Sequence, residues 1–236
     1  LSHDTLICNG KIKITGSKSE TNRLLFLQSL FPNFKIQNKS NSDDSSVMQA
    51  ALKSTSDFID INHAGTAMRF LTSYFSQLEG REVILTGSKR MQQRPIKILV
   101  DALKSLGASI EYEKKQGYPP LRIKGKKLDG GTISLPADIS SQYISSLIML
   151  GPILKAGIEL NLKGTITSMP YINMTLDLLK RLGIKTEFKG HRILVKNTSK
   201  SKNTIQVVES DWSSASYFFS IAALSDKAKI YLSNYK

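Results

Sequence analysis

The sequence of 236 residues predicts an α/β (α+β) fold in which helices pack against mixed sheets and one unit recurs. Helical periodicity alternates along the chain with short strand-like runs. D-A-L-K-S-L-G-A-S-I-E-Y at 101–112 returns as D-L-L-K-R-L-G-I-K-T-E-F at 177–188. L-P-A-D-I-S-S-Q-Y at 135–143 likewise resembles V-E-S-D-W-S-S-A-S at 208–216. Repeats of this length are supersecondary units that bury their apolar faces against one another.

The elements follow from these patterns in chain order. An extended stretch at 11–15 precedes seven amphipathic helical segments, expected at residues 19–30, 45–53, 66–77, 95–106, 140–150, 170–182 and 213–224. Strand-like runs separate them at residues 83–86, 109–113, 121–124, 132–135, 157–162, 185–188, 193–196 and 204–208. Gly107 and Gly183 suit the left-handed position after a helix end. Two helices with their strands form a unit, so we expect three units by residue 207 and the start of a fourth.

Composition narrows the class of protein. The 40% hydrophobic content is enough for a core, and no run approaches the roughly 18 apolar residues that span a bilayer. The first residues lack the basic-then-apolar layout of a signal peptide. Cys8 is the single cysteine, which excludes an intramolecular disulfide and a zinc pattern. We therefore expect a soluble protein in a reduced compartment, the cytoplasm, with no membrane partner.

The formal net charge is +14, from 33 Lys+Arg against 19 Asp+Glu. This excess favours anionic partners, among them nucleic acids and phosphorylated metabolites. A lysine-rich solvated surface is the more common explanation of such a charge. No aromatic RNA-binding signature or helix-turn-helix pattern accompanies it. A basic nucleic-acid-binding module remains an alternative interpretation that charge alone does not decide.

The first strand-to-helix junction reads G-S-K-S-E-T-N-R from residue 16. Ser17 and Glu20 fit a capping box, which places Lys18 and Ser19 in the first helical turn. Arg23 follows four residues after Ser19 on the same face. A helix start already favours an anion, so these side chains predict a phosphate or carboxylate site. An ordinary cap with solvated cations is the alternative, and the glycine spacing excludes a nucleotide P-loop.

Other helix starts carry similar chemistry. Gly65 and Thr66 begin one helix, where glycine lets backbone amides approach a ligand. Arg94 stands before Pro95, which is expected as a first helical residue, so its guanidinium suits a carboxylate. Two more starts supply hydroxyl and amide groups from Ser140, Ser141, Gln142, Ser168 and Tyr171. Singly each is more often a cap, but together they suggest one anionic, hydroxyl-rich ligand.

Six of these motifs resemble the 5-enolpyruvylshikimate-3-phosphate synthase family. They are G-S-K-S-E-T-N-R, A-G-T-A-M-R, R-M-Q-Q-R-P-I-K-I-L-V-D-A-L-K-S-L-G-A, S-S-Q-Y-I-S-S-L, P-Y-I-N-M-T-L and E-S-D-W-S-S-A-S-Y-F, in the family's order. The resemblance implies an enolpyruvyl transferase fold with two domains of three βαβαββ units each. It also implies transfer of the enolpyruvyl group of phosphoenolpyruvate to the 5-hydroxyl of shikimate 3-phosphate, with release of phosphate.

The resemblance assigns roles to residues by motif. Lys18 would be catalytic and contact both substrates. Shikimate 3-phosphate would be bound by Lys18, Ser19, Arg23, Ser140, Ser141, Gln142, Ser168 and Tyr171. Phosphoenolpyruvate would be bound by Lys18, Gly65, Thr66, Arg94 and Gln142. The resemblance implies no metal, no organic cofactor and no nucleic acid, and a monomer for the full-length enzyme.

The resemblance also divides the chain. Residues 1–14 would belong to the C-terminal domain, residues 15–207 would form the N-terminal domain of three units, and 208–236 would start the C-terminal domain. The family's remaining acid–base groups would lie beyond residue 236. We therefore expect this chain to bind substrate, to be inactive alone and to need a missing C-terminal half as its partner.

Three positions depart from the family pattern. His63 stands where asparagine is common, Phe70 replaces a proline, and Trp212 replaces a small residue. The first two flank the phosphoenolpyruvate region, where glyphosate competes in this family, so sensitivity to that inhibitor does not follow. The rival enolpyruvyl transferase acting on UDP-N-acetylglucosamine typically carries a reactive cysteine before its R-P helix. That loop here reads R-M-Q-Q-R-P, which disfavours the rival.

Overall fold

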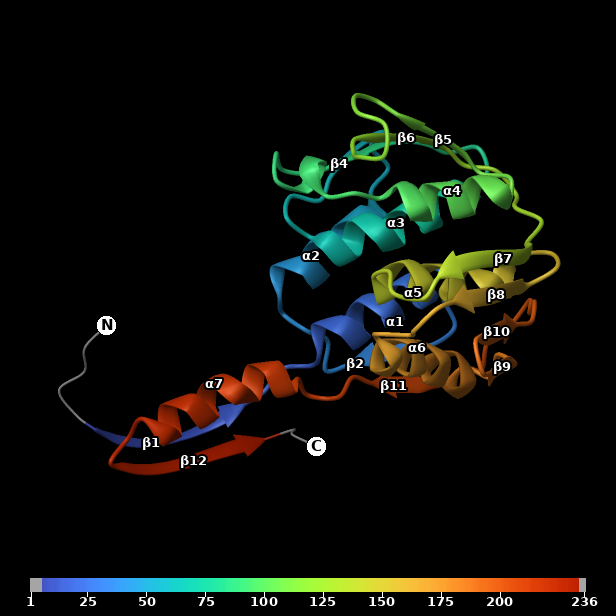
Figure 1. Cartoon of the computed structure of the whole chain (residues 1–236). Coiled ribbons are helices and arrows are strands. Elements are labelled where there is room, and N and C mark those ends of the chain that lie inside the picture. Colours follow the sequence, from blue (N-terminus) through green and yellow to red (C-terminus); the bar gives the residue numbers. More distant parts are fainter. Residues whose placement is uncertain (1–5, 234–236) are drawn as a thin grey trace.

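A computed structural model describes residues 6–233 of the chain (Figure 1). Its helices are α1 Lys18–Leu30, α2 Asp43–Lys53, α3 Gly65–Gln77, α4 Lys97–Ser105, α5 Ser141–Leu150, α6 Met169–Arg181 and α7 Trp212–Ala223. Its strands are β1 Ile7–Lys13, β2 Lys35–Gln37, β3 Phe58–Asp60, β4 Glu82–Thr86, β5 Ser109–Tyr112, β6 Leu121–Lys124, β7 Gly131–Pro136, β8 Ile158–Lys163, β9 Thr186–Lys189, β10 Arg192–Val195, β11 Ile205–Val207 and β12 Lys227–Ser233. The 3₁₀ turns Met91–Gln93 and Gly151–Ile153 complete the set.

Two βαβαββ units have identical topology. The first runs β3-α3-β4-α4-β5-β6 and the second β7-α5-β8-α6-β9-β10. Their sheets have the orders β3-β4-β6-β5 and β7-β8-β10-β9, so each follows first, second, fourth, third. The first two strands pair in parallel, and the later pairs are antiparallel. The repeat between 101–112 and 177–188 therefore corresponds to equivalent helix–strand segments, α4-β5 and α6-β9.

The third unit is not contiguous, a feature that the expectation of three units by residue 207 did not include. Near the N-terminus α1, β2 and α2 follow one another, and β11 from the other end of the described chain pairs in parallel with β2. The pair reproduces the first and second strands of the complete units. The two closing strands have no counterpart in this sheet. The unit is thus assembled from both ends of the chain.

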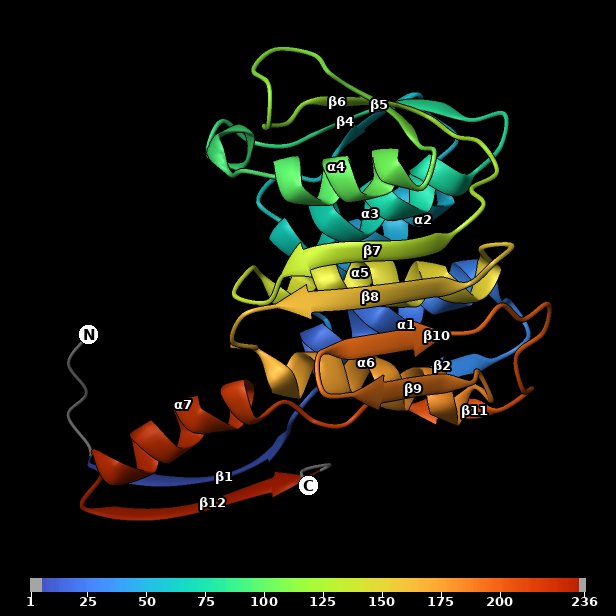
Figure 2. The same ribbon diagram turned by 45° about the vertical axis from the view of Figure 1, so that its right-hand side comes forward.

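The three units together form the main part of the structure, called the body below. Helices α1 to α6 form its interior. In Figure 2 the sheet β7-β8-β10-β9 covers α5 and α6, while the sheet containing β4, β5 and β6 lies over α3 and α4. One apolar core joins all three units, and Phe26, Phe70 and Phe75 are at most 1% exposed within it. Complete burial of one such side chain stabilises a fold by roughly 1.5–3 kcal/mol. The core holds the helix starts of the three units in fixed positions.

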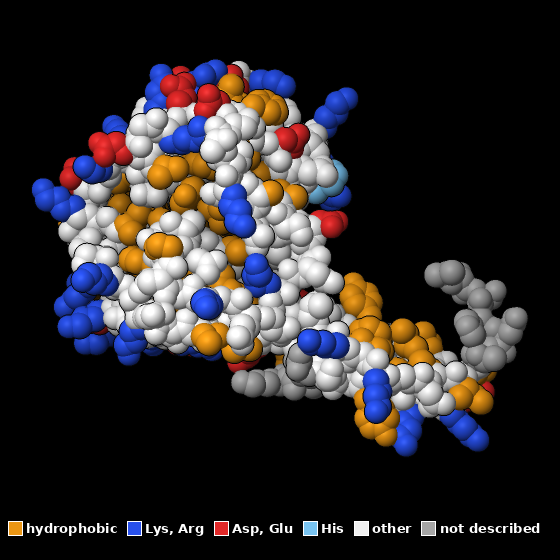
Figure 3. All heavy atoms as spheres, turned by 180° about the vertical axis from the view of Figure 1, so that it is seen from behind, with side chains coloured by type: hydrophobic (Ala, Val, Ile, Leu, Met, Phe, Trp, Pro, Cys, Tyr) orange, Lys and Arg blue, Asp and Glu red, His pale blue; other side chains and the backbone are white. Residues whose placement is uncertain are grey.

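The segments β1, α7 and β12 form an arm that projects from the body (Figures 1 and 2). Strands β1 and β12 pair in parallel, and α7 packs on β12. Only Ala215 of α7 is buried. Apolar side chains gather on this arm in Figure 3; those exposed on α7 and its end are Trp212, Tyr217, Phe219, Ile221 and Leu224. The chain crosses between arm and body twice, side by side, where Gly16 bridges Ser210.

All seven expected helices are present, with shifted ends. Glycine ends the helix as expected after α4, because Gly107 has φ +98° and the Gly107 and Ala108 amides donate to the Lys104 and Leu103 carbonyls. The helix expected from Pro95 instead begins at Lys97. Arg94 is extended (φ −93°, ψ 124°), as a residue before proline prefers.

The strand predictions were less complete. All eight expected runs correspond to strands, but β2, β3 and β12 were missed, and the stretch 11–15 is wrong in its ends. β2 and β3 have three residues each, too few for alternation to be visible. β1 spans Ile7–Lys13 because its register is set by β12. Residues 1–5 and 234–236 of the expected terminal segments lie outside the described residues.

Residues 6–233 contain neither a membrane-spanning helix nor a cluster of metal ligands. None of the helices there combines the length and apolar composition needed to cross a bilayer. No three His, Cys, Asp or Glu side chains of that part gather as metal ligands would.

Candidate functional site

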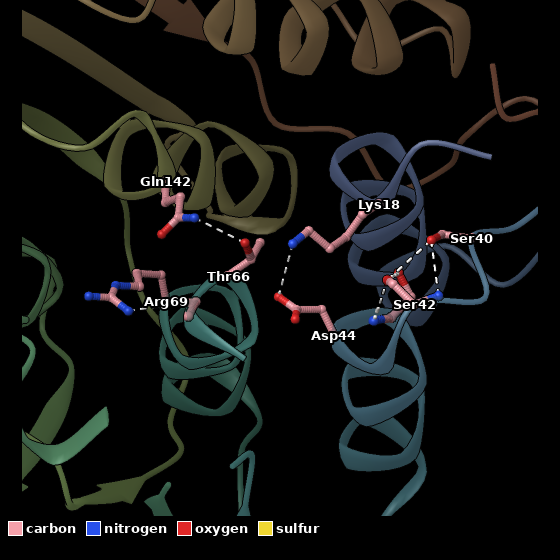
Figure 4. Close-up of polar contacts among 9 residues, drawn as sticks. Lys18, Ser40, Ser42, Asp44, Thr66, Arg69 and Gln142 are labelled. Atoms are coloured by element: carbon pink, nitrogen blue, oxygen red, sulfur yellow. Dashed lines mark hydrogen bonds and ion pairs between the residues drawn. The ribbon is translucent and has the colours of Figure 1, made fainter. Parts of the chain in front are cut away.

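The first turns of four helices lie together in Figure 4. Lys18 is the first residue of α1, Asp44 the second of α2, Thr66 the second of α3 and Gln142 the second of α5. Each helix start has free backbone N–H groups and the positive end of a dipole. These starts therefore form a region suited to anions, built from all three units of the body.

Lys18 faces an acidic neighbour across this region. Its Nζ lies 3.7 Å from Oδ1 of Asp44, and the two side chains are 46% and 28% exposed. Asp44 stands in the first turn of α2, where an acid is favourable, behind the N-cap Ser42, whose hydroxyl accepts the Ser45 N–H. An ion pair this exposed contributes at most about 1 kcal/mol. Asp44 orients the ammonium group and leaves it accessible to a second anion.

The capping box expected at α1 is not formed. Ser17 holds the N-cap position without a side-chain capping bond. Its amide donates instead to the Glu209 carbonyl at 2.7 Å, so Glu20 has no N-cap amide to bind. The Glu20 carboxylate accepts from the Glu209 amide at 2.9 Å and from Arg181 at 3.2 Å. Burial raises the pKa of Glu20. Through its two bonds Glu20 joins α1 to α6 and to Glu209, which lies in the segment between β11 and α7.

Arg94 and Gly65 lie in direct contact. A Cβ atom at residue 65 would stand 2.3 Å from an Nη atom of Arg94, a distance that real Cβ contacts do not show. Only glycine therefore allows this placement of the guanidinium. Beside them, the Gln142 amide donates to the Thr66 hydroxyl at 3.0 Å and joins α5 to α3. The structure thus brings Gly65 to Arg94 and Thr66 to Gln142.

Arg69 lies behind this group and is only 4% exposed. It donates to the Gly65 carbonyl at 3.0 Å and to the Pro95 carbonyl at 3.3 Å. The Tyr143 ring lies 5.8 Å from its guanidinium carbon. Burial lowers the pKa of Arg69, opposed by Tyr143 and reinforced by Arg94. Its Nε is buried without a hydrogen-bond partner, and in residues 6–233 no carboxylate pairs with Arg69.

Arg23 is more buried than the expected ligand-binding role suggests, at 2% exposure. It donates to Thr175 Oγ1 at 2.8 Å, to Ser145 Oγ at 2.9 Å and to the Ser19 carbonyl at 2.9 Å. The Tyr171 ring lies 5.7 Å from its guanidinium carbon. Burial lowers the pKa of Arg23 to about 10. Three of its five N–H groups are used in these hydrogen bonds, and the bonds to Thr175 and Ser145 fix α1 against α6 and α5.

The hydroxyl-bearing residues differ in placement. Ser140 is the N-cap of α5 and accepts the Gln142 amide, whereas Ser141 is buried at 8% exposure. Ser168 is the N-cap of α6, and its hydroxyl makes no hydrogen bond within the described residues. Tyr171 is 45% exposed. Hydrogen bonds and ring contacts therefore link Arg23 to Ser19 and Tyr171, but in residues 6–233 none links Ser140, Ser141 or Ser168 to Lys18.

A cavity of about 430 Å³ adjoins Arg94 and is lined by His63, Arg90, Met91 and Arg94. Sequence reasoning treated His63 only as a departure from the family pattern, and it missed Arg90, Asp44 and Arg69 as parts of the site. Asp44 gives no signal of its own, because an acid near a helix start is common. Arg69 carried a signal, because an arginine in an apolar helix face is costly to bury without a partner.

The family model described as EPSP synthase (3-phosphoshikimate 1-carboxyvinyltransferase) matches residues 35–236. A 3-phosphoshikimate 1-carboxyvinyltransferase of Bacteroides fragilis is 48% identical over 222 residues, which cover 94% of this chain and 54% of the relative. The enzyme of that name from Colwellia psychrerythraea is 37% identical over 245 residues, covering 92% and 57%.

The solved structure of an EPSP synthase from Acinetobacter baumannii has the same fold, with a TM-score of 0.77 at 21% identity. The match covers 94% of this chain and 55% of that one. The chain therefore spans about half the length of the proteins it matches. The family match, the similar relatives and the shared fold lead to one conclusion: the chain belongs to the EPSP synthase family.

Proposed function

We propose that this chain contributes the N-terminal half of a 3-phosphoshikimate 1-carboxyvinyltransferase site. In that reaction the 5-hydroxyl of shikimate 3-phosphate adds to the enolpyruvyl group of phosphoenolpyruvate, and phosphate leaves. Both substrates are anionic, and the observation that carries the proposal is the meeting of four helix starts with Lys18 and the Arg94 guanidinium. Fixed cations of this kind stabilise charge that develops during addition and elimination.

The two substrates occupy adjacent parts of this region in the proposal. Phosphoenolpyruvate binds beside Gly65, Thr66 and Arg94, where the close packing of Arg94 on Gly65 leaves the guanidinium fork for a carboxylate. Gln142 lies between the ligands through its bond to Thr66. Shikimate 3-phosphate binds Lys18 together with the residues on α1, α5 and α6, namely Ser19, Arg23, Ser140, Ser141, Ser168 and Tyr171.

The proposal assigns Lys18 to both substrates. Its ammonium is the exposed cation of the α1 start and lies on the side of α1 that faces α2 and α3 in Figure 4. When an anion binds to Lys18, the weak ion pair between Lys18 and Asp44 breaks and water hydrates the Asp44 carboxylate instead. Lys18 then neutralises charge between the two ligands and acts as the catalytic group of this half.

The remaining chemistry comes from a C-terminal half. The parallel pairing of β1 with β12 supports a second domain that contains residues 1–14 and 208–236, separate from the domain of 15–207. The exposed apolar face of α7 supports burial against further chain. The match covers only 54% of the Bacteroides fragilis relative, so proteins of this kind have a further segment that is long enough for a second domain. The complete enzyme in this proposal is a cytoplasmic monomer.

The test follows phosphate release from both substrates. The 236-residue chain alone gives no sustained turnover, because loss of acid–base groups alone costs about 10²- to 10⁴-fold and the half-site also excludes water poorly. Addition of the remaining half of the enzyme as a separate polypeptide restores phosphate release. The Lys18→Met chain with the same partner does not. Turnover by the chain alone would show that the chemistry lies elsewhere.

A further inference from the structure

A second cavity, of about 380 Å³, lies at the end of α6 that is remote from the candidate site. The residues that line it include Lys180, Lys185, Glu187, Leu194 and Lys196. Lys180 stands in the last turn of α6 and Ser168 caps its first turn, so about 18 Å of helix separate them. In Figure 2 strands β9 and β10 lie in front of α6, on the outside of the body. The cavity is thus a separate place, large enough for a small molecule.

Two lysines of this lining oppose each other across neighbouring strands. The Lys196 amide donates to the Lys185 carbonyl at 3.0 Å, one step beyond Thr186 and Val195, which pair at the end of the β9–β10 ladder. Opposite residues of an antiparallel ladder point to the same face with Cβ atoms about 4.5–5.5 Å apart, and like charges so placed are destabilising. In residues 6–233 neither lysine forms an ion pair with a carboxylate. The charge of this pair is therefore uncompensated.

The first unit shows that the shared topology does not require this lysine pair. The repeat of 101–112 at 177–188 places Lys185 at the position of Ser109. The opposite residue is a lysine in both units, Lys196 and Lys124. In the first unit, however, Lys124 opposes an uncharged serine on β5 and pairs with Glu82 on β4. In the second unit Lys196 opposes Lys185, and its neighbour toward β8 is a glycine. The uncompensated charge is therefore particular to the second unit.

Two further lysines add to this charge. Lys180 lines the cavity and makes only an exposed ion pair, at 3.6 Å, with an aspartate of its own helix. Lys202 packs on Gly183, another residue of the lining, because its side-chain atoms would lie 3.0–3.2 Å from a Cβ there. Among the described residues Glu187 is the only acid of the lining. The unpaired lysines number three with Lys202, and against one glutamate they leave a net charge of +2.

We propose that this cavity binds a small ligand with two or more phosphate groups, held by Lys185, Lys196 and Lys202. A single negative charge does not neutralise the lining, whereas a diphosphate or triphosphate group does. Lysine suits such a ligand, because its ammonium is a point charge with rotatable donors on a flexible stem. Free polyphosphates and nucleoside polyphosphates share this chemistry. The site does not depend on the proposed function, since none of its residues belongs to the candidate site.

The experiment titrates the 236-residue chain calorimetrically with tripolyphosphate at low ionic strength. One exposed ion pair contributes up to about fivefold in affinity. Lys185→Gln and Lys196→Gln should therefore each weaken binding about fivefold, and the double variant about 25-fold. Glu187→Gln should tighten binding about fivefold, because it removes the repelling charge of the lining. ATP is titrated in parallel: equal affinity means that the triphosphate alone is recognised, and tighter binding of ATP assigns the site to a nucleotide.

Thermal unfolding gives an independent readout. Lys185→Gln should raise Tm of the ligand-free chain, because it relieves the repulsion from Lys196, and tripolyphosphate should raise Tm of the parent more than that of the variant. Lys124→Gln is the matched control, because it removes an exposed lysine at the equivalent position beside Glu82, and it should keep the parental affinity.

Three results would overturn the proposal. Parental affinity in the double variant would show that the lysine pair binds nothing. Equal weakening in Lys124→Gln would mean that tripolyphosphate responds only to the overall positive charge of the chain. Loss of binding in Lys18→Met would place the ligand at the candidate site instead.

Discussion

Replacing Gly65 with alanine tests how the structure positions Arg94. The new Cβ would stand 2.3 Å from one Nη atom and 3.0 Å from the guanidinium carbon, whereas ordinary contacts begin near 3.4 Å. The guanidinium must therefore move by about 1 Å, a displacement that costs about 100-fold where geometry is critical. One or two charge-assisted hydrogen bonds, worth about 1.5–3 kcal/mol each, are lost or weakened.

We expect Gly65→Ala to weaken phosphoenolpyruvate binding by about 10- to 100-fold. Shikimate 3-phosphate binding should change less than about twofold, because the displaced group is not among its assigned contacts. Stability should stay within about 1 kcal/mol of the parent, since the clash involves the far end of a flexible side chain and alanine favours a helix. Calorimetric titration of each ligand and thermal unfolding measure the three quantities.

Gly10→Ala is the matched control, because a Cβ at residue 10 meets nothing within 4 Å. It should leave both affinities unchanged. Unaltered phosphoenolpyruvate binding in Gly65→Ala would refute the role of this contact. Equal weakening of both ligands with a large loss of stability would mean that Gly65 is required for folding instead.

Three further predictions concern the charged groups. Arg94→Lys should weaken phosphoenolpyruvate binding at least tenfold more than shikimate 3-phosphate binding, because lysine keeps the charge and loses the planar fork; equal losses by calorimetry would contradict this. Arg23→Met should destabilise the chain by about 3 kcal/mol, since it leaves the buried Thr175 hydroxyl without its donor, and lower Tm by roughly 6–12 °C; a fall under 2 °C would contradict this. Burial raises the pKa of Glu20, so the folded chain holds this proton to higher pH than the unfolded chain, and the stability it contributes is lost as pH rises above about 4.5. Glu20→Gln should therefore gain stability relative to the parent between pH 4.5 and 7 in urea unfolding, and an unchanged difference across that range would refute the assignment.

Local patterns were sufficient to predict the repeated units and the helices. The periodicity of 101–112 and 177–188, each ended by a glycine, predicts α4 and α6, because capping depends on nearby residues. The pairing of β11 with β2 was not predictable in this way. It joins segments about 170 residues apart, and nothing in either three-residue strand specifies its partner.

The sequence named candidate site residues but did not predict the contacts of their side chains. Gly65 and Lys18 became candidates because helix starts with glycine and cations favour anions, whereas the helix expected to follow Arg94 directly begins only at Lys97. The role of Glu20 was mistaken, since the amide it would cap is bound by Glu209, a residue distant in sequence. The burial of Arg23 was likewise unpredictable, because Ser145 and Thr175 come from other helices. Side-chain partners supplied by tertiary contacts are absent from local sequence.

The central claim is that the helix starts around Lys18 bind a phosphorylated shikimate. The most direct measurement is a calorimetric titration of the 236-residue chain with shikimate 3-phosphate and, in parallel, with shikimate. Two or more charge-assisted hydrogen bonds to the phosphate predict saturable one-to-one binding at least about 100-fold tighter for the phosphorylated ligand, and loss of this preference in Lys18→Met. Equal affinity for the two ligands, or a preference that survives in Lys18→Met, would contradict the account.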